Sequence, residues 1–117
     1  MDDLQIYEYS GDGYKPMHDF GAWRVALLRY GVRFDINTMT ELERHLETDE
    51  IFVLLSGEAF LLIGEDMRRV SMEYGKIYNV PAGVWHGISV SEDASVLIVE
   101  NADTTRENSE RIPIRGK

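Results

Sequence analysis

Four side chains able to do metal or acid–base chemistry lie in two short stretches of this sequence. Glu43, His45 and Glu50 lie in the first stretch, and His86 lies in the second. If two imidazoles and one or two carboxylates converge, they can bind a divalent ion such as Fe(II), Mn, Ni or Zn, and the absence of cysteine disfavours softer ions. Without a cation, two buried glutamates would raise each other's pKa, so that one could act as a general acid or base.

The segment that carries the second histidine predicts a strand, a tight turn and a returning strand. Gly75 can adopt a positive φ, and residues 76–80 have strand-forming character. Pro81 and Gly83 then favour a chain reversal, because proline fixes φ and glycine supplies the unusual dihedral. His86 would begin the returning strand, on the same face as the apolar residues two and four positions later. Taken alone, a histidine in such a hairpin is more often structural than functional.

The spacing of this segment resembles the second motif of the cupin family, G-x5-P-x-G-x2-H-x3-N. Gly75, Pro81, Gly83 and His86 stand at the four positions that match. Val90 stands where the family usually has asparagine. Four matches out of five make this resemblance specific, and a functional role for the histidine depends on a further motif upstream.

The upstream stretch resembles the first cupin motif, whose usual core is H-x-H-x(3,4)-E-x6-G. His45 takes the place of the second histidine, Glu50 that of the glutamate and Gly57 that of the glycine. Glu43 stands at the position of the first histidine, which is a departure from the pattern. The resemblance carries specific motifs over residues 43–90.

The resemblance implies an all-β fold, the cupin double-stranded β-helix or jelly-roll barrel of two antiparallel sheets, as a single domain over residues 1–117. It also implies that Glu43, His45, Glu50 and His86 hold one divalent transition metal, Fe, Mn, Ni or Zn. Two imidazoles and a carboxylate would leave coordination positions open for a substrate.

Two functions remain open at this point. One is a metal-dependent enzyme of the dioxygenase, isomerase or lyase type that acts on a small polar, carboxylate or sugar-like molecule. The other is a non-catalytic small-molecule-binding or regulatory cupin with a degenerate metal site. The carboxylate of Glu43 preserves a donor, which favours a retained metal. Val90, in place of the usual asparagine, favours a metal site that has been lost.

A helix is the competing interpretation of the first motif. Thr38 and Glu41 fit a capping box, and Leu42 and Leu46 lie four apart. Against a helix, residues 51–55 form an apolar run closed by a serine and a glycine, which predicts a strand buried on both faces. We favour strands, and because that run is apolar at every position we also expect a homodimer.

Strand-like runs recur along the chain between turn signals, and no convincing helix separates them. They cover residues 4–9, 23–30, 32–37, 51–55, 59–63, 67–71, 76–80, 85–90 and 95–100. About nine or ten short strands with close turns indicate a sandwich or barrel. The tail over residues 102–117 is polar, but Ile112 and Ile114 could pack on a sheet edge or on a partner.

Length and charge bound the remaining possibilities. The chain has 117 residues, 44% of them hydrophobic, which suits one globular domain. With 12 basic and 21 acidic residues the net charge is -9, so nucleic acid and anionic membrane surfaces would be repelled. The sequence shows neither an apolar stretch of membrane-spanning length nor a basic-then-apolar leader. We therefore expect a cytoplasmic protein with a small-molecule ligand and with no nucleic-acid or membrane partner.

Other polar and aromatic residues give weaker signals. We expect His18 in a solvated loop away from the site, and Glu47 exposed in a turn. Arg24 and Arg33 could meet an anionic substrate, although a solvated face is the default for both. Trp85 should point away from the histidine that follows it, which suits an interface.

Overall fold

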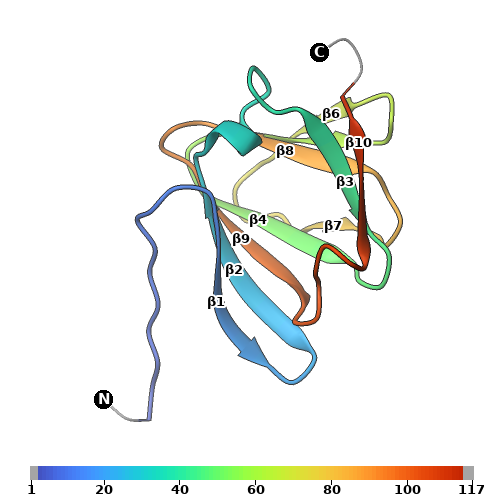
Figure 1. Ribbon diagram of the computed structural model, residues 1–117. Coiled ribbons are helices and arrows are strands. Elements are labelled where there is room, and N and C mark those ends of the chain that lie inside the picture. Colours follow the sequence, from blue (N-terminus) through green and yellow to red (C-terminus); the bar gives the residue numbers. More distant parts are fainter. Residues whose placement is uncertain (1–2, 115–117) are drawn as a thin grey trace.

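The computed structural model describes residues 3–114, and within them two five-stranded antiparallel sheets face each other (Figure 1). The first sheet contains, in spatial order, β1 (Tyr14–Phe20), β2 (Trp23–Arg29), β9 (Ser95–Asn101), β4 (Glu50–Ser56) and β7 (Tyr78–Val80). The second contains β10 (Ser109–Pro113), β3 (Glu41–His45), β8 (His86–Val90), β5 (Ala59–Ile63) and β6 (Arg68–Ser71). Strands distant in sequence are neighbours in both sheets, so the predicted all-β jelly roll is confirmed.

The apolar side chains of the central strands of the first sheet point between the sheets. Along β4 the side chains at alternate positions, Phe52 and Leu54, are buried, and β9 repeats this pattern with Val96 and Ile98. The run over residues 51–55 is not buried on both faces, because Leu55 is 51% exposed at the end of β4. The two inner faces form the main core.

The glycines of the two motifs occupy turns that need positive φ. Gly57, Gly75 and Gly83 have φ values of 72°, 79° and 85°. At Gly57 a Cβ atom would also lie 2.6 Å from the Cα atom of Ala94, so a larger residue would displace the neighbouring loop. Backbone geometry therefore accounts for the glycines that the motif spacing singled out.

The first motif forms a strand rather than a helix. Strand β3 lies between β10 and β8, and Glu43 is the cross-strand partner of both His86 and Arg111. The tail supplies β10, and Ile114 is buried in a second, smaller core cluster. Packing of the tail on a sheet edge is thus confirmed, while residues 115–117 lie outside the described part.

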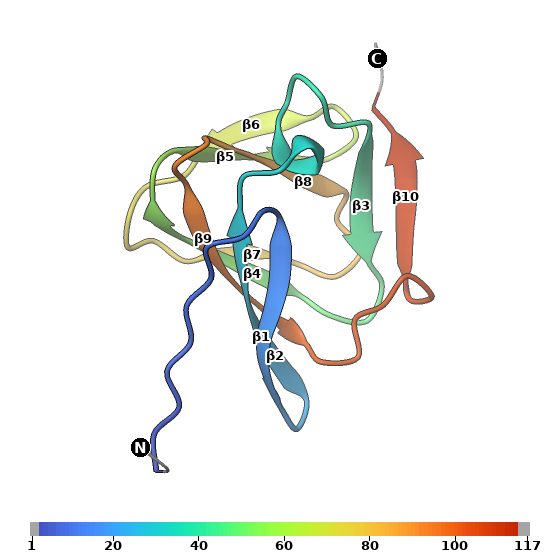
Figure 2. The same cartoon turned by 60° about the vertical axis from the view of Figure 1, so that its left-hand side comes forward.

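Two local predictions were wrong, and one strand was not predicted. Residues 4–9 form no strand, because no other strand of the same chain pairs with their backbone in the described part (Figure 2). Residues 32–37 turn instead of extending: Val32–Phe34 is a 3-10 turn, and the carboxylate of Asp35 accepts a hydrogen bond from the Asn37 backbone. Strand β1 was not among the predicted strands; it contains Pro16 and lies at a sheet edge, where proline is tolerated.

Candidate metal centre

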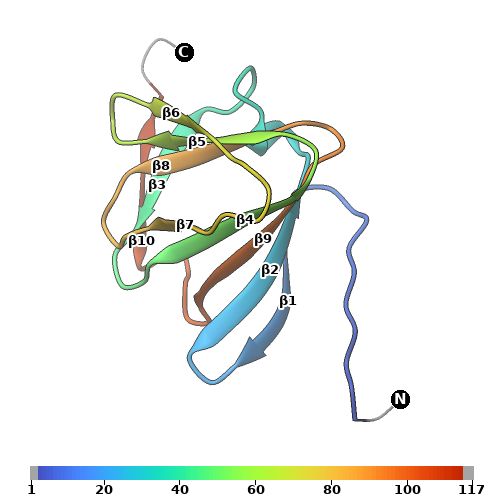
Figure 3. The same cartoon turned by 180° about the vertical axis from the view of Figure 1, so that it is seen from behind.

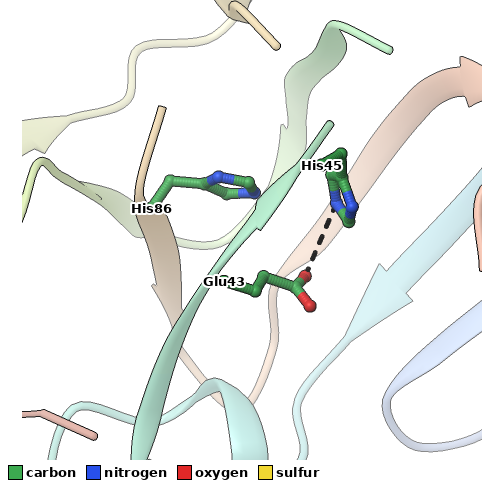
Figure 4. A group of neighbouring side chains, drawn as sticks. All are labelled: Glu43, His45 and His86. Carbon is green, nitrogen blue, oxygen red and sulfur yellow. Dashed lines mark ion pairs between the residues drawn. The ribbon is translucent and has the colours of Figure 1, made fainter. Parts of the chain in front are cut away.

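The structure brings all four predicted site residues together. Glu43 and His45 lie two positions apart on β3 and so share a face, Glu50 begins β4, and His86 begins β8. Figure 4 shows the side chains of Glu43, His45 and His86 around one space. One ligand atom from each of these three lies within 4.8 Å of the others.

Glu50 is the centre of this group. Its Oε1 atom lies 3.0 Å from Nε2 of His45 and 3.0 Å from Nε2 of His86. The two imidazole rings are 5.4 Å apart, and Glu43 Oε1 is 3.7 Å from His45 Nε2. Both imidazoles therefore direct the same nitrogen at one carboxylate oxygen.

The other ring nitrogens are held by partners on the far side. Nδ1 of His86 donates to the carbonyl oxygen of Val84 at 3.0 Å, because a carbonyl can only accept. In a neutral His86 the lone pair therefore sits on Nε2 and faces the carboxylate. Nδ1 of His45 lies 2.9 Å from Ser109 Oγ. Such outer partners orient metal-binding histidines.

Burial and mutual contact shift the pKa values of this group. Burial raises the pKa of Glu50, but hydrogen bonds from His45 and His86 outweigh it and hold the pKa at about 2. Burial lowers the pKa of each histidine, but its hydrogen bond to Glu50 outweighs this, so both pKa values lie above their ordinary value. In the absence of another cation, the imidazoles supply the positive charge.

Glu100 is a fifth site residue that the motifs did not reveal. It is 6% exposed near the end of β9, and its carboxylate lies within 4.8 Å of ligand atoms of His45 and Glu50. Tyr14 donates to Glu100 Oε1 at 2.6 Å. Burial, and then the charge of Glu50, raise the pKa of Glu100. The period of two along β9, which places this acid on the same face as Val96 and Ile98, was the available signal.

Arg111 lies beside the residue that replaces the motif histidine. Its Nη2 atom is 3.2 Å from Glu43 Oε2, and its Nε atom is 3.2 Å from Glu41 Oε1. Within the described residues that buried Nε makes no hydrogen bond, so the contact with Glu41 is electrostatic only. Nothing in either motif points to Arg111, because β10 lies outside both.

These polar groups line a cavity of about 310 Å³ between the sheets. Its apolar wall comes from Leu28, Phe52, Ile88 and Ile98. Arg33 and Arg106 also line it, and both are exposed. The cavity thus combines an acidic and imidazole-bearing interior with an apolar wall and exposed guanidinium groups.

The weaker candidates fall into three groups. Arg24 lines the cavity, and its guanidinium pairs with Asp19 at 2.9 Å. Its side chain is therefore not on a solvated face, which was the default expectation. His18 lies in strand β1 rather than in a loop and contacts the rings of Tyr7 and Trp23. Glu47 is exposed, as expected.

Trp85 points away from the imidazole that follows it and is partly buried within the chain. It lies against the second core cluster, which contains Met39 and Leu42. The guanidinium of Arg44 covers the indole at 4.5 Å. This cluster fills the outer side of β3 and β8 and leaves the inner side to the site.

Comparison with known proteins places this geometry in a family. The family described as Cupin domain matches residues 32–100, which contain both motifs. No curated protein matches the sequence. The second motif matches through its glycines, proline and histidine, although Val90 departs from it.

Solved structures share the fold at low identity. A cupin-2 domain containing protein from Shewanella frigidimarina is 18% identical over 80% of this chain and 84% of its own, with a TM-score of 0.61. The nucleoside dehydratase Pac13, a Streptomyces protein also solved with uridine, is 7% identical over 94% of this chain and 93% of its own, with a TM-score of 0.65. KdgF from Halomonas is 17% identical over 75% and 76%, with a TM-score of 0.56. At these identities the likeness concerns the fold. In residues 3–114 no helix is long and apolar enough to cross a membrane.

Proposed function

Because this chain belongs to the cupin domain family, we propose that it is a metal-dependent enzyme acting on a small polar molecule in the cavity between its sheets. His45, His86 and Glu50 would hold one divalent transition ion, with Glu43 as a fourth ligand. Nitrogen and oxygen donors without thiolates fit Fe(II), Mn, Ni or Zn.

The contact between Glu50 Oε1 and two Nε2 atoms, each at 3.0 Å, carries this proposal. A carboxylate and two neutral imidazole lone pairs repel one another unless protons or a cation lie between them. The outer partner of His86 fixes its lone pair toward Glu50, which is the tautomer that a metal ligand requires. A divalent ion would therefore replace the protons that otherwise hold this group together.

The bound ion would polarise a substrate oxygen as a Lewis acid. The remaining tasks belong to residues of the chain. Leu28, Ile88 and Ile98 exclude water from the cavity, and Tyr14 holds a proton at Glu100 Oε1. A buried carboxylate with a raised pKa beside the substrate space suits proton transfer, so an isomerase or lyase fits these residues better than a dioxygenase.

The exposed guanidinium groups suggest the substrate class. Arg33 and Arg106 line the cavity, and neither forms a salt bridge within the described residues. A carboxylate on the substrate could accept hydrogen bonds from either. The polar interior would meet hydroxyl groups, so a hydroxy or keto acid, including an acidic sugar, fits the cavity best.

Metal analysis combined with turnover tests the proposal. Purified protein should contain close to one equivalent of a transition metal, and His45→Ala or His86→Ala should lose it and abolish turnover of sugar acids and keto acids. Glu47→Gln, which alters an exposed carboxylate nearby, is the matched control. Less than about a tenth of an equivalent, with none taken up on addition of metal, would refute the metal-dependent function.

The ion pair of Arg111 with Glu43 favours a second candidate, a binding module with a degenerate metal site. The guanidinium neutralises the carboxylate that replaces the motif histidine, so this part of the site is compensated without an ion. Such a module would bind a small molecule equally well with and without chelator, and no turnover would accompany binding. The proposed enzyme would lose its activity on chelation and regain it on adding metal.

A further inference from the structure

A second cavity lies at the end of the barrel opposite the candidate metal centre. Glu50 and His86 begin β4 and β8, whereas the turns that follow the ends of these two strands surround the second cavity. Figure 3 shows those turns on the right and the starts of both strands on the left. The cavity has a volume of about 850 Å³, and among the described residues none lines both cavities.

The floor of the second cavity is apolar and buried. Leu54, Ala59, Met72 and Val90 line it, and each of them is at most 7% exposed. Val90 is the cross-strand partner of Ala59, and it stands where the cupin pattern usually has asparagine. Valine gives the floor an aliphatic side chain in place of an amide. The departure from the second motif therefore favours a ligand with an apolar body.

The rim of this cavity is negatively charged. Asp35, Glu58, Glu73 and Glu92 line it, and among the described residues no lysine, arginine or histidine does so. Glu73 pairs with Lys76 at 2.8 Å, but neither Glu58 nor Glu92 forms a salt bridge within residues 3–114. Such a rim attracts a cation and repels an anion.

Two tyrosine rings also line the second cavity. Tyr74 is 64% exposed, yet its hydroxyl donates to the carbonyl oxygen of Gly57 at 2.7 Å. The hydroxyl of Tyr30 donates to the carboxylate of Asp35. These hydrogen bonds hold the rings in place, and the face of an aromatic ring attracts a positive charge. The rings therefore add to the preference for a cation that the carboxylates create.

We infer that the second cavity binds an organic ammonium ion, with the ammonium group at the carboxylates and the apolar body on the floor that contains Val90. A bare metal ion would gain nothing from the buried apolar floor, and a neutral apolar molecule would gain nothing from the carboxylates. The net charge of -9 adds to the attraction for a cation. This inference is independent of the proposed function, because the two cavities have separate linings.

Titration of the full-length chain with 2-phenylethylamine, followed through the NMR signals of the backbone amides, tests the inference. We expect saturable shifts in residues 57–60 and 89–92 near neutral pH, with a Kd of about 1 mM or tighter, as for a fragment-sized ligand. Added salt should weaken binding, because it screens the charges. The uncharged analogue 2-phenylethanol should bind at least about tenfold more weakly, because it lacks the ammonium group.

Substitutions at the rim identify the groups that bind the ammonium ion. Combining Glu58→Gln with Glu92→Gln should weaken amine binding by about fivefold to tenfold, and Tyr74→Ala by about threefold to fivefold. Glu65→Gln, at an exposed acid outside the cavity, and Phe20→Ala, at a ring that is 69% exposed elsewhere, are the matched controls. Both controls should bind the amine as the wild type does.

Several results would each overturn the inference. They are the absence of saturable shifts up to about 10 mM amine, shifts confined to residues of the first cavity, equal binding of the amine and the alcohol, and unchanged binding in the double variant. Displacement of the amine by an equal concentration of Mg²⁺ would also overturn it, because it would show a general attraction of cations to an acidic surface. A chelator should leave amine binding unchanged, which separates this result from that of the proposed metal centre.

Discussion

Arg111 and Glu43 are cross-strand partners on β10 and β3, and their side chains meet at 3.2 Å. The guanidinium thus binds one carboxylate oxygen, Oε2, while the other, Oε1, lies 3.7 Å from Nε2 of His45. Glu43 stands where the cupin pattern usually has histidine, a neutral ligand. A strand from outside both motifs therefore supplies the charge that compensates the additional carboxylate.

Removing this guanidinium should strengthen metal binding. In Arg111→Met a positive charge beside the proposed ion is lost and Glu43 is freed, so we expect affinity for Zn or Mn to rise by about threefold to tenfold, the effect of a weak to moderate charge contact. Competition with a fluorescent chelator measures the change. Arg44→Met is the control, because Arg44 pairs with Glu110 and covers Trp85. A fall in affinity would show that Arg111 holds Glu43 in its ligating position.

The metal-free protein should be most stable in mildly acidic solution. The raised pKa values of His45 and His86 contribute stability that is fully present below the ordinary histidine pKa of 6.5 and is lost as pH rises through the folded values. The lowered pKa of Glu50 contributes stability that is present above the ordinary glutamate pKa of 4.5 and is lost as pH falls toward about 2. The melting temperature in chelator should therefore peak between these two values. A profile that climbs steadily from pH 5 to pH 8 would contradict the proton arrangement in the site.

Replacing the buried acid on β9 should stabilise the metal-free protein near neutral pH. Burial raises the pKa of Glu100, so its ionised form costs stability above that pKa. Glu100→Gln removes this charge and keeps an oxygen to accept from Tyr14, so Tm should rise by about 2–8 °C at pH 7 and little at pH 4. Glu92→Gln is a control at an exposed acid. An equal rise at both values of pH would indicate a packing effect instead.

Alanine substitutions at two adjacent leucines of β4 should distinguish a core position from a surface position. Leu54 is 3% exposed, so Leu54→Ala should cost about 2–5 kcal/mol in the free energy of unfolding. Leu55 is 51% exposed, and Leu55→Ala should change that free energy by less than about 0.5 kcal/mol. Urea denaturation measures both. Similar losses at the two positions would indicate that Leu55 is covered in solution.

The sequence predicted those parts of the fold that backbone geometry or strand alternation specify. Gly57, Gly75 and Gly83 occupy the turns that their spacing required, and the side chains of the two motifs converge. Strand alternation also separates the buried and exposed faces of β4 and β9.

Contacts made by segments outside the motifs could not be predicted in this way. Glu100 and Arg111 enter the site through β9 and β10, and sequence spacing does not report which strands become neighbours. Residues 4–9 have strand character without an intrachain partner, because propensity specifies a conformation and not a pairing. Strand β1, which contains Pro16, was not predicted, because the sequence does not show that this segment lies at a sheet edge, where proline is tolerated.

The most direct test of the proposed metal centre is calorimetric titration of the demetallated protein with Zn or Mn in buffers of different ionisation enthalpy near pH 6.5. One ion per chain should bind, and binding should release protons, because the ion displaces those shared by Glu50 with His45 and His86. His86→Ala should weaken binding by about a hundredfold, while Glu47→Gln should bind as the wild type does. Failure to bind an ion, or binding that survives the loss of both imidazoles, would contradict the account.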